Sequence, residues 1–274
     1  MRAFRSVLFL FVSVAVFLSG WFNPLNALEL TVSPIRIEHR IVPEKTVEGT
    51  VLVSSRGDEE VRIRVSAGDW TLRPNGDIEF LPAGRQPRSL NRWLTVYPVE
   101  FTVGRGRAQT VRYRLKPPGE ITGTYWGMLF FETVRPAMGG AENTVSIFTA
   151  GRIAVPIYAT TERGGVRDGR VTGVTANWAE EKGEKGLLKL GATFANLGNI
   201  LVRLKGRFEI KDARADKVVA KVAFEDLAVL PGGTREIAAE WSGKLEAGTY
   251  VAIAIVDYGG RNLVAGQRTF KVGK

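Results

Sequence analysis

The stretch Val111-Arg112-Tyr113-Arg114-Leu115 alternates between apolar and arginine side chains, and this pattern decides the fold class. Successive side chains of a β-strand point to opposite faces of the sheet, so the alternation predicts a strand with its apolar face in a core and its arginines in water. The stretch Val61-Arg62-Ile63-Arg64-Val65 has the same pattern. We therefore expect a protein built from half-buried strands.

Working outward, the first half of the chain contains more strand-like runs of this kind. They lie at residues 30–37, 50–54, 93–97, 124–133 and 145–159. Turn-forming clusters such as Pro74-Asn75-Gly76-Asp77 separate them at short intervals. About seven short strands with no long helical period predict an antiparallel β-sandwich of the immunoglobulin-like type.

The second half repeats this style after a break. Residues 160–169 are polar and glycine-rich and have no periodicity, so we place a domain boundary after residue 161. Further strand-like runs follow at 170–176, 187–195, 201–211, 218–224, 234–239, 250–258 and 267–272. The sequence therefore predicts an all-β protein with two immunoglobulin-like antiparallel β-sandwich domains, at residues 28–161 and 162–274.

Residues 1–27 have the features of a signal peptide. Arg2 and Arg5 precede an uncharged, mostly apolar run at residues 7–22, and residues 23–27 supply a breaker and a small residue at a plausible cleavage point. The apolar run is shorter than the roughly 20 residues that a membrane-spanning helix needs. We expect export to the periplasm and a mature chain, beginning near Leu28, without stable membrane insertion; an uncleaved N-terminal anchor is the alternative.

Composition excludes several classes of function. The chain of 274 residues has 38 Lys and Arg against 28 Asp and Glu, one His and no Cys. The lack of Cys excludes disulfides, thiolate metal sites, iron–sulfur clusters and cysteine nucleophiles, and a single His excludes multi-histidine metal centres. The positive charge is spread without a long block of one sign, so nothing indicates nucleic-acid binding.

The sequence offers little to an enzyme. His39 lies within Ile37-Glu38-His39-Arg40, where we expect it at the surface, and the chain has neither a Gly-x-Ser-x-Gly nucleophile motif nor a phosphate-binding glycine loop. The acidic pairs Glu59-Glu60 and Glu180-Glu181 lie in charged, turn-like stretches and are expected to be solubilising. We therefore predict no catalytic residue, no metal site and no cofactor.

The order of motifs in the first half is more specific. Ser33-Pro34-Ile35-Arg36-Ile37 opens it, the segments 93–101, 109–112 and 123–131 follow, and residues 152–158 close it. This order resembles the N-terminal domain of the periplasmic pilus-assembly chaperones, the PapD-like immunoglobulin-fold family. The resemblance implies a two-domain, boomerang-shaped protein that lends a strand to a secreted pilin-like or other surface-fibre subunit.

The resemblance also implies which residues bind the partner. Val145, Ile147 and Thr149 would belong to the lent strand, with Ile153 further along it. A plain core strand explains the same alternation. An exposed apolar edge invites self-association, so a self-capped homodimer is a possible state without a partner.

A charged pair completes the implied site. The family anchors the C-terminal carboxylate of its partner with an Arg on the first strand and a Lys on the last strand of the first domain. Arg36 matches the first position, whereas Ala154 stands at the second; Arg152, two residues earlier on the same face, is the candidate substitute. A surface arginine on an edge strand is the alternative for Arg36.

A second function stays open beside the chaperone. An exposed tryptophan, with Trp126 as the candidate, would stack on a sugar ring and make the chain a non-enzymatic cell-surface structural or adhesive protein that binds wall polymer or glycan. Packing of the tryptophans in the cores explains the same residues.

Overall fold

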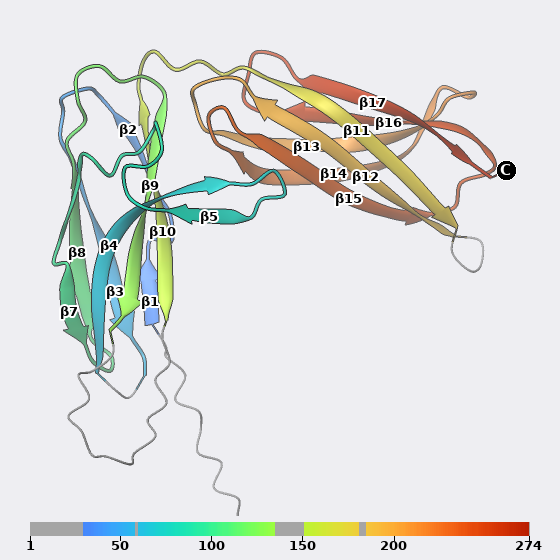
Figure 1. The fold of residues 1–274 in the computed structure, drawn as a ribbon. Helices are drawn as coiled ribbons and strands as arrows, with labels where there is room; N and C mark the ends of the chain where they lie inside the picture. The colour runs from blue at the N-terminus through green and yellow to red at the C-terminus, as the bar shows by residue number, and fades with distance from the viewer. Residues whose placement is uncertain (1–29, 58–59, 135–150, 181–184, 274) are drawn as a thin grey trace, which may run out of the picture.

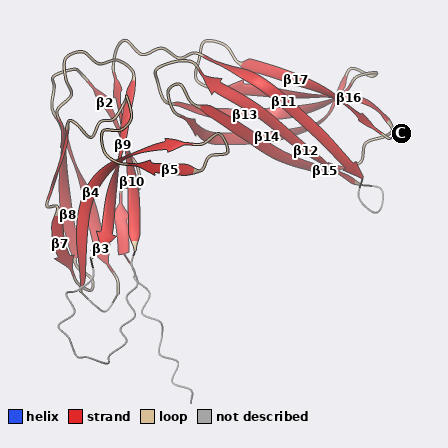
Figure 2. Ribbon diagram, in the orientation of Figure 1, coloured by secondary structure: helices blue, strands red, loops and turns tan. Residues whose placement is uncertain are grey.

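The computed structural model describes residues 30–57, 60–134, 151–180 and 185–273. These residues form 17 strands, and none of them lies in a helix (Figure 2). The strands make two β-sandwiches that meet at an elbow (Figure 1). The predicted all-β class with two sandwiches is confirmed. No helix long and apolar enough to cross a membrane occurs within the described ranges.

The first sandwich has a smaller and a larger sheet. The smaller sheet has the order β1 (Leu30–Ser33), β3 (Val47–Ser55), β8 (Ala108–Leu115), β6 (Leu94–Tyr97). The larger sheet has the order β2 (Ile37–Ile41), β10 (Arg152–Thr161), β9 (Thr124–Thr133), β4 (Val61–Leu72), β5 (Ile78–Leu81), and β7 (Glu100–Val103) also pairs with β4. The sheets enclose one core.

The alternating stretches occupy the places that their pattern predicts. Val111 and Leu115 of β8 and Ile63 of β4 are fully buried in the core between the sheets. Arg62 and Arg114, which alternate with them, are exposed. The period-two pattern therefore fixes which face of each strand turns inward.

The run at residues 30–37, expected as one strand, is divided between the two sheets, so that prediction is wrong. β1 pairs antiparallel with β3, whereas β2 pairs in parallel with β10. Pro34 lies at the division, because it has no N–H to continue a ladder, and Ile35 beside it is 81% exposed. The chain thus crosses from one sheet to the other within a few residues.

The larger sheet of the first sandwich is buried on both faces along β9. In β9, Leu129 and Phe131 point into the core between the sheets, whereas Trp126, Met128 and Phe130 point the other way and are also buried. The outward set belongs to a separate cluster, which we call the elbow cluster. Its buried members are Trp70, Trp126, Met128, Phe130, Tyr158 and Leu230.

Leu230 comes from the second sandwich, and Leu201 of that sandwich packs at the margin of the elbow cluster. The cluster therefore joins the two sandwiches through apolar contact. Backbone hydrogen bonds accompany it: the N–H of Thr124 donates to the carbonyl of Asn199 at 2.8 Å, and the N–H of Glu236 donates to that of Pro74 at 2.7 Å.

The second sandwich also has two sheets. The first has the order β11 (Gly169–Glu180), β12 (Gly186–Asn196), β15 (Thr234–Gly243), and the second has the order β14 (Lys217–Val229), β13 (Val202–Asp212), β16 (Gly248–Asp257), β17 (Val264–Val272). A single cluster, with Phe194 and Phe208 fully buried, lies between them. Residues 162–168, between β10 and β11, carry no strand.

Candidate functional site

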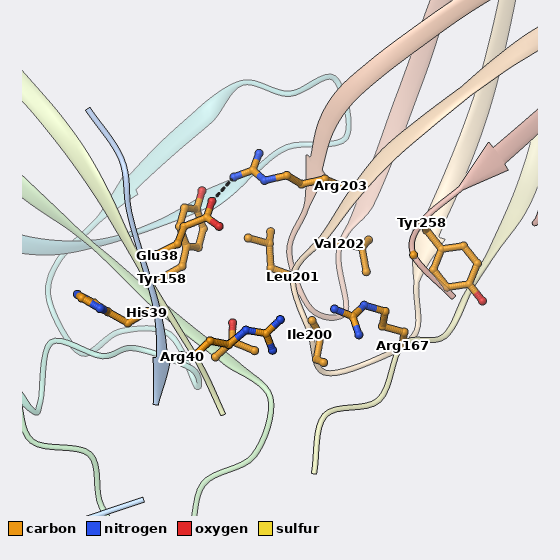
Figure 3. Close-up of a pocket in the computed structure, with 12 residues that line it drawn as sticks. Glu38, His39, Arg40, Tyr158, Arg167, Ile200, Leu201, Val202, Arg203 and Tyr258 are labelled. Atoms are coloured by element: carbon orange, nitrogen blue, oxygen red, sulfur yellow. Dashed lines mark hydrogen bonds and ion pairs between the residues drawn. The ribbon is translucent and has the colours of Figure 1, made fainter. Parts of the chain in front are cut away.

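A cavity of about 430 Å³ lies between the two sandwiches and is drawn in Figure 3. β2 and β10 form one wall, and residues around the start of β13 and the end of β16 form the other. Arg167 enters from the linker, residues 162–168, between β10 and β11. The lining residues are Glu38, His39, Arg40, Tyr158, Thr160, Arg167, Ile200, Leu201, Val202, Arg203, Tyr258 and Gly259. The cavity therefore depends on both sandwiches.

A network of ion pairs spans one side of this cavity, which we also call the cleft. Arg203 of β13 donates through Nη2 to Glu38 Oε1 of β2 at 2.7 Å and through Nη1 to Asp226 Oδ1 at 3.0 Å. Arg36 lies 3.1 Å from Glu38 through Nε and 4.0 Å from Asp226 through Nη1. Two arginines and two carboxylates thus balance in charge across the two sandwiches.

Burial and pairing shift the proton affinities of two groups here. Burial alone would lower the pKa of Arg203, but the hydrogen bond to Glu38 and the nearby carboxylates outweigh it and raise the pKa. Burial raises the pKa of Tyr158 to about 12, although Arg203 opposes the shift. Both groups therefore keep their protons throughout the ordinary pH range.

His39 is not at the free surface position expected for it. It is half-buried on β2 between Ile37 and Ile41, and its Nε2 lies 2.8 Å from the hydroxyl oxygen of Tyr113. Burial lowers the pKa of His39. The imidazole is turned away from the arginines that line the cavity (Figure 3).

The two arginines implied by the sequence lie in different surroundings. Arg36 belongs to the ion network of the cleft and is 46% exposed at its side chain. Arg152 pairs with Glu132 at 2.6 Å, and its guanidinium lies over the ring of Phe130 at 3.6 Å from the centroid. The structure therefore does not bring Arg36 and Arg152 together around one place.

The other implied residues are divided by what the structure describes. Ile153 is partly buried against the core of the first sandwich and pairs with Phe131 of β9. Val145, Ile147 and Thr149 lie outside the described residues.

β10 has an edge that is only half covered. It pairs with β9 from Arg152 to Thr160, but with β2 only from Ile157 to Thr161. The N–H of Thr161 donates to Gly123 on the β9 side, and that of Glu162 donates to Ile41 on the β2 side.

Because backbone groups alternate in direction along a strand, even-numbered residues of β10 present theirs to the β2 side. Arg152 and Ala154 lie before the start of the β2 pairing, so no described strand pairs with their outward N–H and C=O groups. Pro156 has no N–H to offer there. Among the described strands, the half of β10 that comes first in the chain is thus an open edge.

Trp126, the candidate for sugar stacking, is buried. It is 6% exposed within the elbow cluster, and its Nε1 donates to the carbonyl of Trp70 at 2.8 Å. No flat face of this ring is available to a sugar.

Sequence reasoning missed the residues of the second sandwich that face the cleft. Arg203 and Glu38 are 165 residues apart, and Arg203 lies in an ordinary alternating strand, so no local signal marks it. Within the described ranges, no group of three or more His, Asp and Glu side chains is placed to hold a metal ion.

No family model matches the sequence, and no curated protein matches it. Similar solved structures include the class 5 fimbriae chaperone CfaA, at 13% identity over 88% of this chain and 99% of that chain, with a TM-score of 0.48. The Escherichia coli chaperone DraB has 14% identity over 90% and 98%, with a TM-score of 0.42. The Pseudomonas aeruginosa CupB2 chaperone has 14% over 89% and 100%, with a TM-score of 0.39.

These proteins belong to the class that the first half of the sequence resembles. At this identity and TM-score, the similarity assigns no function and no binding residue to the chain.

Proposed function

We propose that this chain is a periplasmic chaperone-like protein that binds and caps surface-fibre subunits by strand pairing. The observation that supports the proposal is the open edge of β10 at Arg152 and Ala154, in a strand that is otherwise paired on both sides. Main-chain groups at such an edge supply affinity for an extended partner strand, and alternate side chains supply specificity.

The proposed donor strand runs from Val145 to Ile153. Its odd-numbered side chains Val145, Ile147 and Thr149 would fill the groove of a subunit that lacks a strand, whereas Ile153, at the end of the proposed strand, packs against the core of the first sandwich. The partner strand would pair along the open edge, where Arg152 and Ala154 present their backbone groups.

Arg36 has a proposed part in the same capture. Its contact with Asp226, at 4.0 Å, is longer than the other contacts of the ion network, and its side chain is 46% exposed. A carboxylate from the partner would take the place of Asp226 beside this guanidinium. Arg152 would stay with Glu132 and flank the open edge.

The test is a tagged purification of the full-length chain from the periplasm of its own host, followed by mass spectrometry of whatever co-elutes in stoichiometric amount. The expected companion is a small secreted β-rich subunit that lacks a complete sandwich. Recovery of the chain alone, or with wall polymer, would overturn the proposal.

Variants identify the surface used. Val145→Asp with Ile147→Asp is expected to abolish capture while the far-UV circular dichroism and the unfolding temperature stay the same. The matched control is Val219→Asp with Leu263→Asp, which adds the same charge at two exposed apolar positions of the second sandwich. Capture that survives the first pair, or is lost equally with the control pair, contradicts the assigned strand.

A self-capped homodimer is proposed for the chain without a partner, since two open β10 edges would pair with each other. Sedimentation of the purified chain is expected to show a dimer that the Val145→Asp, Ile147→Asp variant converts to a monomer. A monomer at all accessible concentrations would exclude self-capping but not capture of a subunit.

A further inference from the structure

Two arginines that have no partner among the described residues converge on the cavity between the sandwiches. Arg40 extends from β2 and Arg167 from the linker, and their guanidinium groups point toward one another (Figure 3). Across the described residues, neither side chain takes part in a hydrogen bond or ion pair. Two like charges that face each other gain nothing from the arrangement unless an anion lies between them.

The remaining charges of the cleft do not compensate these two. Glu38 is already bonded to Arg203 and Arg36, and Asp226 completes that network, so its two positive and two negative charges cancel. Burial lowers the pKa of His39 and so favours its neutral form, and its Nε2 lies 2.8 Å from the hydroxyl oxygen of Tyr113. Arg40 and Arg167 therefore leave two uncompensated positive charges.

The backbone holds Arg167 in place from both sides. The N–H of Val166 donates to Asn199 Oδ1 at 2.7 Å, and the carbonyl of Asp168 accepts from the N–H of Leu197 at 2.9 Å. The stem of Arg167 also lies against Gly259, 3.8 Å from the position that a Cβ would take there. The linker is thus fixed against the second sandwich with this arginine directed at the cavity.

Arg40 is fixed by the first sandwich. It pairs in parallel with Thr160 of β10, whose hydroxyl lies 2.9 Å from that of Thr124. The backbone is fixed by hydrogen bonds at both arginines. The way in which the two sandwiches are joined therefore determines that the two guanidinium groups face each other.

We propose that Arg40 and Arg167 bind a phosphate group between them. Each guanidinium offers paired N–H donors that match two oxygens of a phosphate, and a phosphate dianion balances the two surplus charges where a carboxylate would balance only one. The cavity, about 430 Å³, has room for a free phosphate ion or for the phosphate of a monoester. This site does not depend on the strand-capping function.

The test is a calorimetric titration of the full-length chain with inorganic phosphate at constant ionic strength, in chloride. Saturable binding of one phosphate per chain is expected. Arg40→Gln and Arg167→Gln are each expected to weaken it by at least about tenfold, since each removes a charge-assisted contact. Arg170→Gln, an exposed arginine of β11, makes the same change in net charge and is expected to leave the affinity unchanged.

Glycerol phosphate distinguishes the source of the ligand. Tighter binding of this monoester than of inorganic phosphate supports a phosphate carried on a larger molecule, and weaker binding supports the free ion. Acetate that binds as tightly as phosphate, with the same loss in both variants, would overturn the assignment of a dianion.

Thermal unfolding in phosphate-free buffer separates ligand binding from a structural role. Because Arg40→Gln and Arg167→Gln relieve repulsion, both variants are expected to be at least as stable as the parent there, and to lose the stabilisation that phosphate gives it. Unchanged phosphate affinity in both variants, or no saturable binding to the parent, would overturn the proposal.

Discussion

The two sandwiches differ in how many sheet faces they bury. In the second sandwich one cluster lies between the sheets, whereas in the first the larger sheet packs on its inner face against the smaller sheet and on its outer face against Leu230 and Leu201 of the second. The comparison shows that β9, apolar on both faces, serves two cores. The stability of the first sandwich therefore depends partly on contacts with the second, in addition to its own core.

The sandwiches also differ in how they protect an open edge. β14 is a long edge strand of the second sandwich, and its exposed residues include Lys217 and Lys221, whose charges oppose pairing with another chain. The open part of β10 carries Ala154 and Pro156, and the charge of Arg152 is taken up by Glu132. Protection is thus weaker at β10, where the partner strand is proposed to bind.

The largest effect is expected from breaking the elbow cluster. Trp126→Ala removes a buried ring from the elbow cluster, whose members come from both sandwiches, so we expect a loss of about 3–5 kcal/mol and two separate unfolding transitions in place of one. Differential scanning calorimetry measures both. The control is Trp241→Ala in the second sandwich, which lies outside the elbow cluster and should leave the transitions coupled. Equal behaviour of the two variants would contradict the role given to the cluster.

The next effect is a loss of stability at alkaline pH, and it concerns Tyr158 of the elbow cluster. The pKa of Tyr158 is raised to about 12, so the unfolded chain releases this proton first, near pH 10, and stability falls as the pH rises from about 10 to 12. The loss attributable to Tyr158 approaches about 2–3 kcal/mol. Urea unfolding between pH 9 and pH 12 should show a smaller slope in Tyr158→Phe, and an identical slope would refute the assignment.

A smaller effect is expected at the ion network. Glu38→Gln leaves Arg36 and Arg203 with Asp226 alone, and because these groups are partly exposed the loss is expected to stay below about 1 kcal/mol. High salt should abolish the difference. Glu48→Gln, which breaks the Arg114 pair within the first sandwich, should give a similar loss without altering coupling between the sandwiches.

The smallest effect is expected at acidic pH, where protonation of His39 destabilises the first sandwich. The pKa of His39 is lowered by burial, so the unfolded state takes up a proton first and stability declines as the pH falls below about 6.5. The chain has 1 His, so the part of the decline that comes from protonation of an imidazole belongs to His39 in the first sandwich. Hydrogen exchange at pH 5 and pH 7.5 should show it near β2 and not in β12 or β13. His39→Asn should remove the difference.

The sequence predicted the strands whose two faces differ. The alternation around Val111 and Leu115 predicts which face of the strand turns to the core, and both side chains are buried there. The crossing at Pro34 was missed because residues 30–37 alternate without regard to which sheet they join.

The cleft was predicted only at Arg36, through a family resemblance. Arg203 and Asp226 come from the other half of the chain and lie near Glu38 because the two sandwiches meet at the elbow. Arg40 and Arg167 likewise line one cavity only because the two sandwiches meet at the elbow. Contacts between the two sandwiches have no period in the sequence that local reasoning can detect.

The crossing at Pro34 ties the two sheets of the first sandwich covalently. Val32 and Ile37 are near neighbours in the sequence, yet they are buried in the same core from opposite sheets. Immunoglobulin domains of antibodies join their sheets with a disulfide, whereas this chain has no Cys. Here a few residues of main chain hold β1 and β2 to opposite sheets, and reducing agents cannot cut that link.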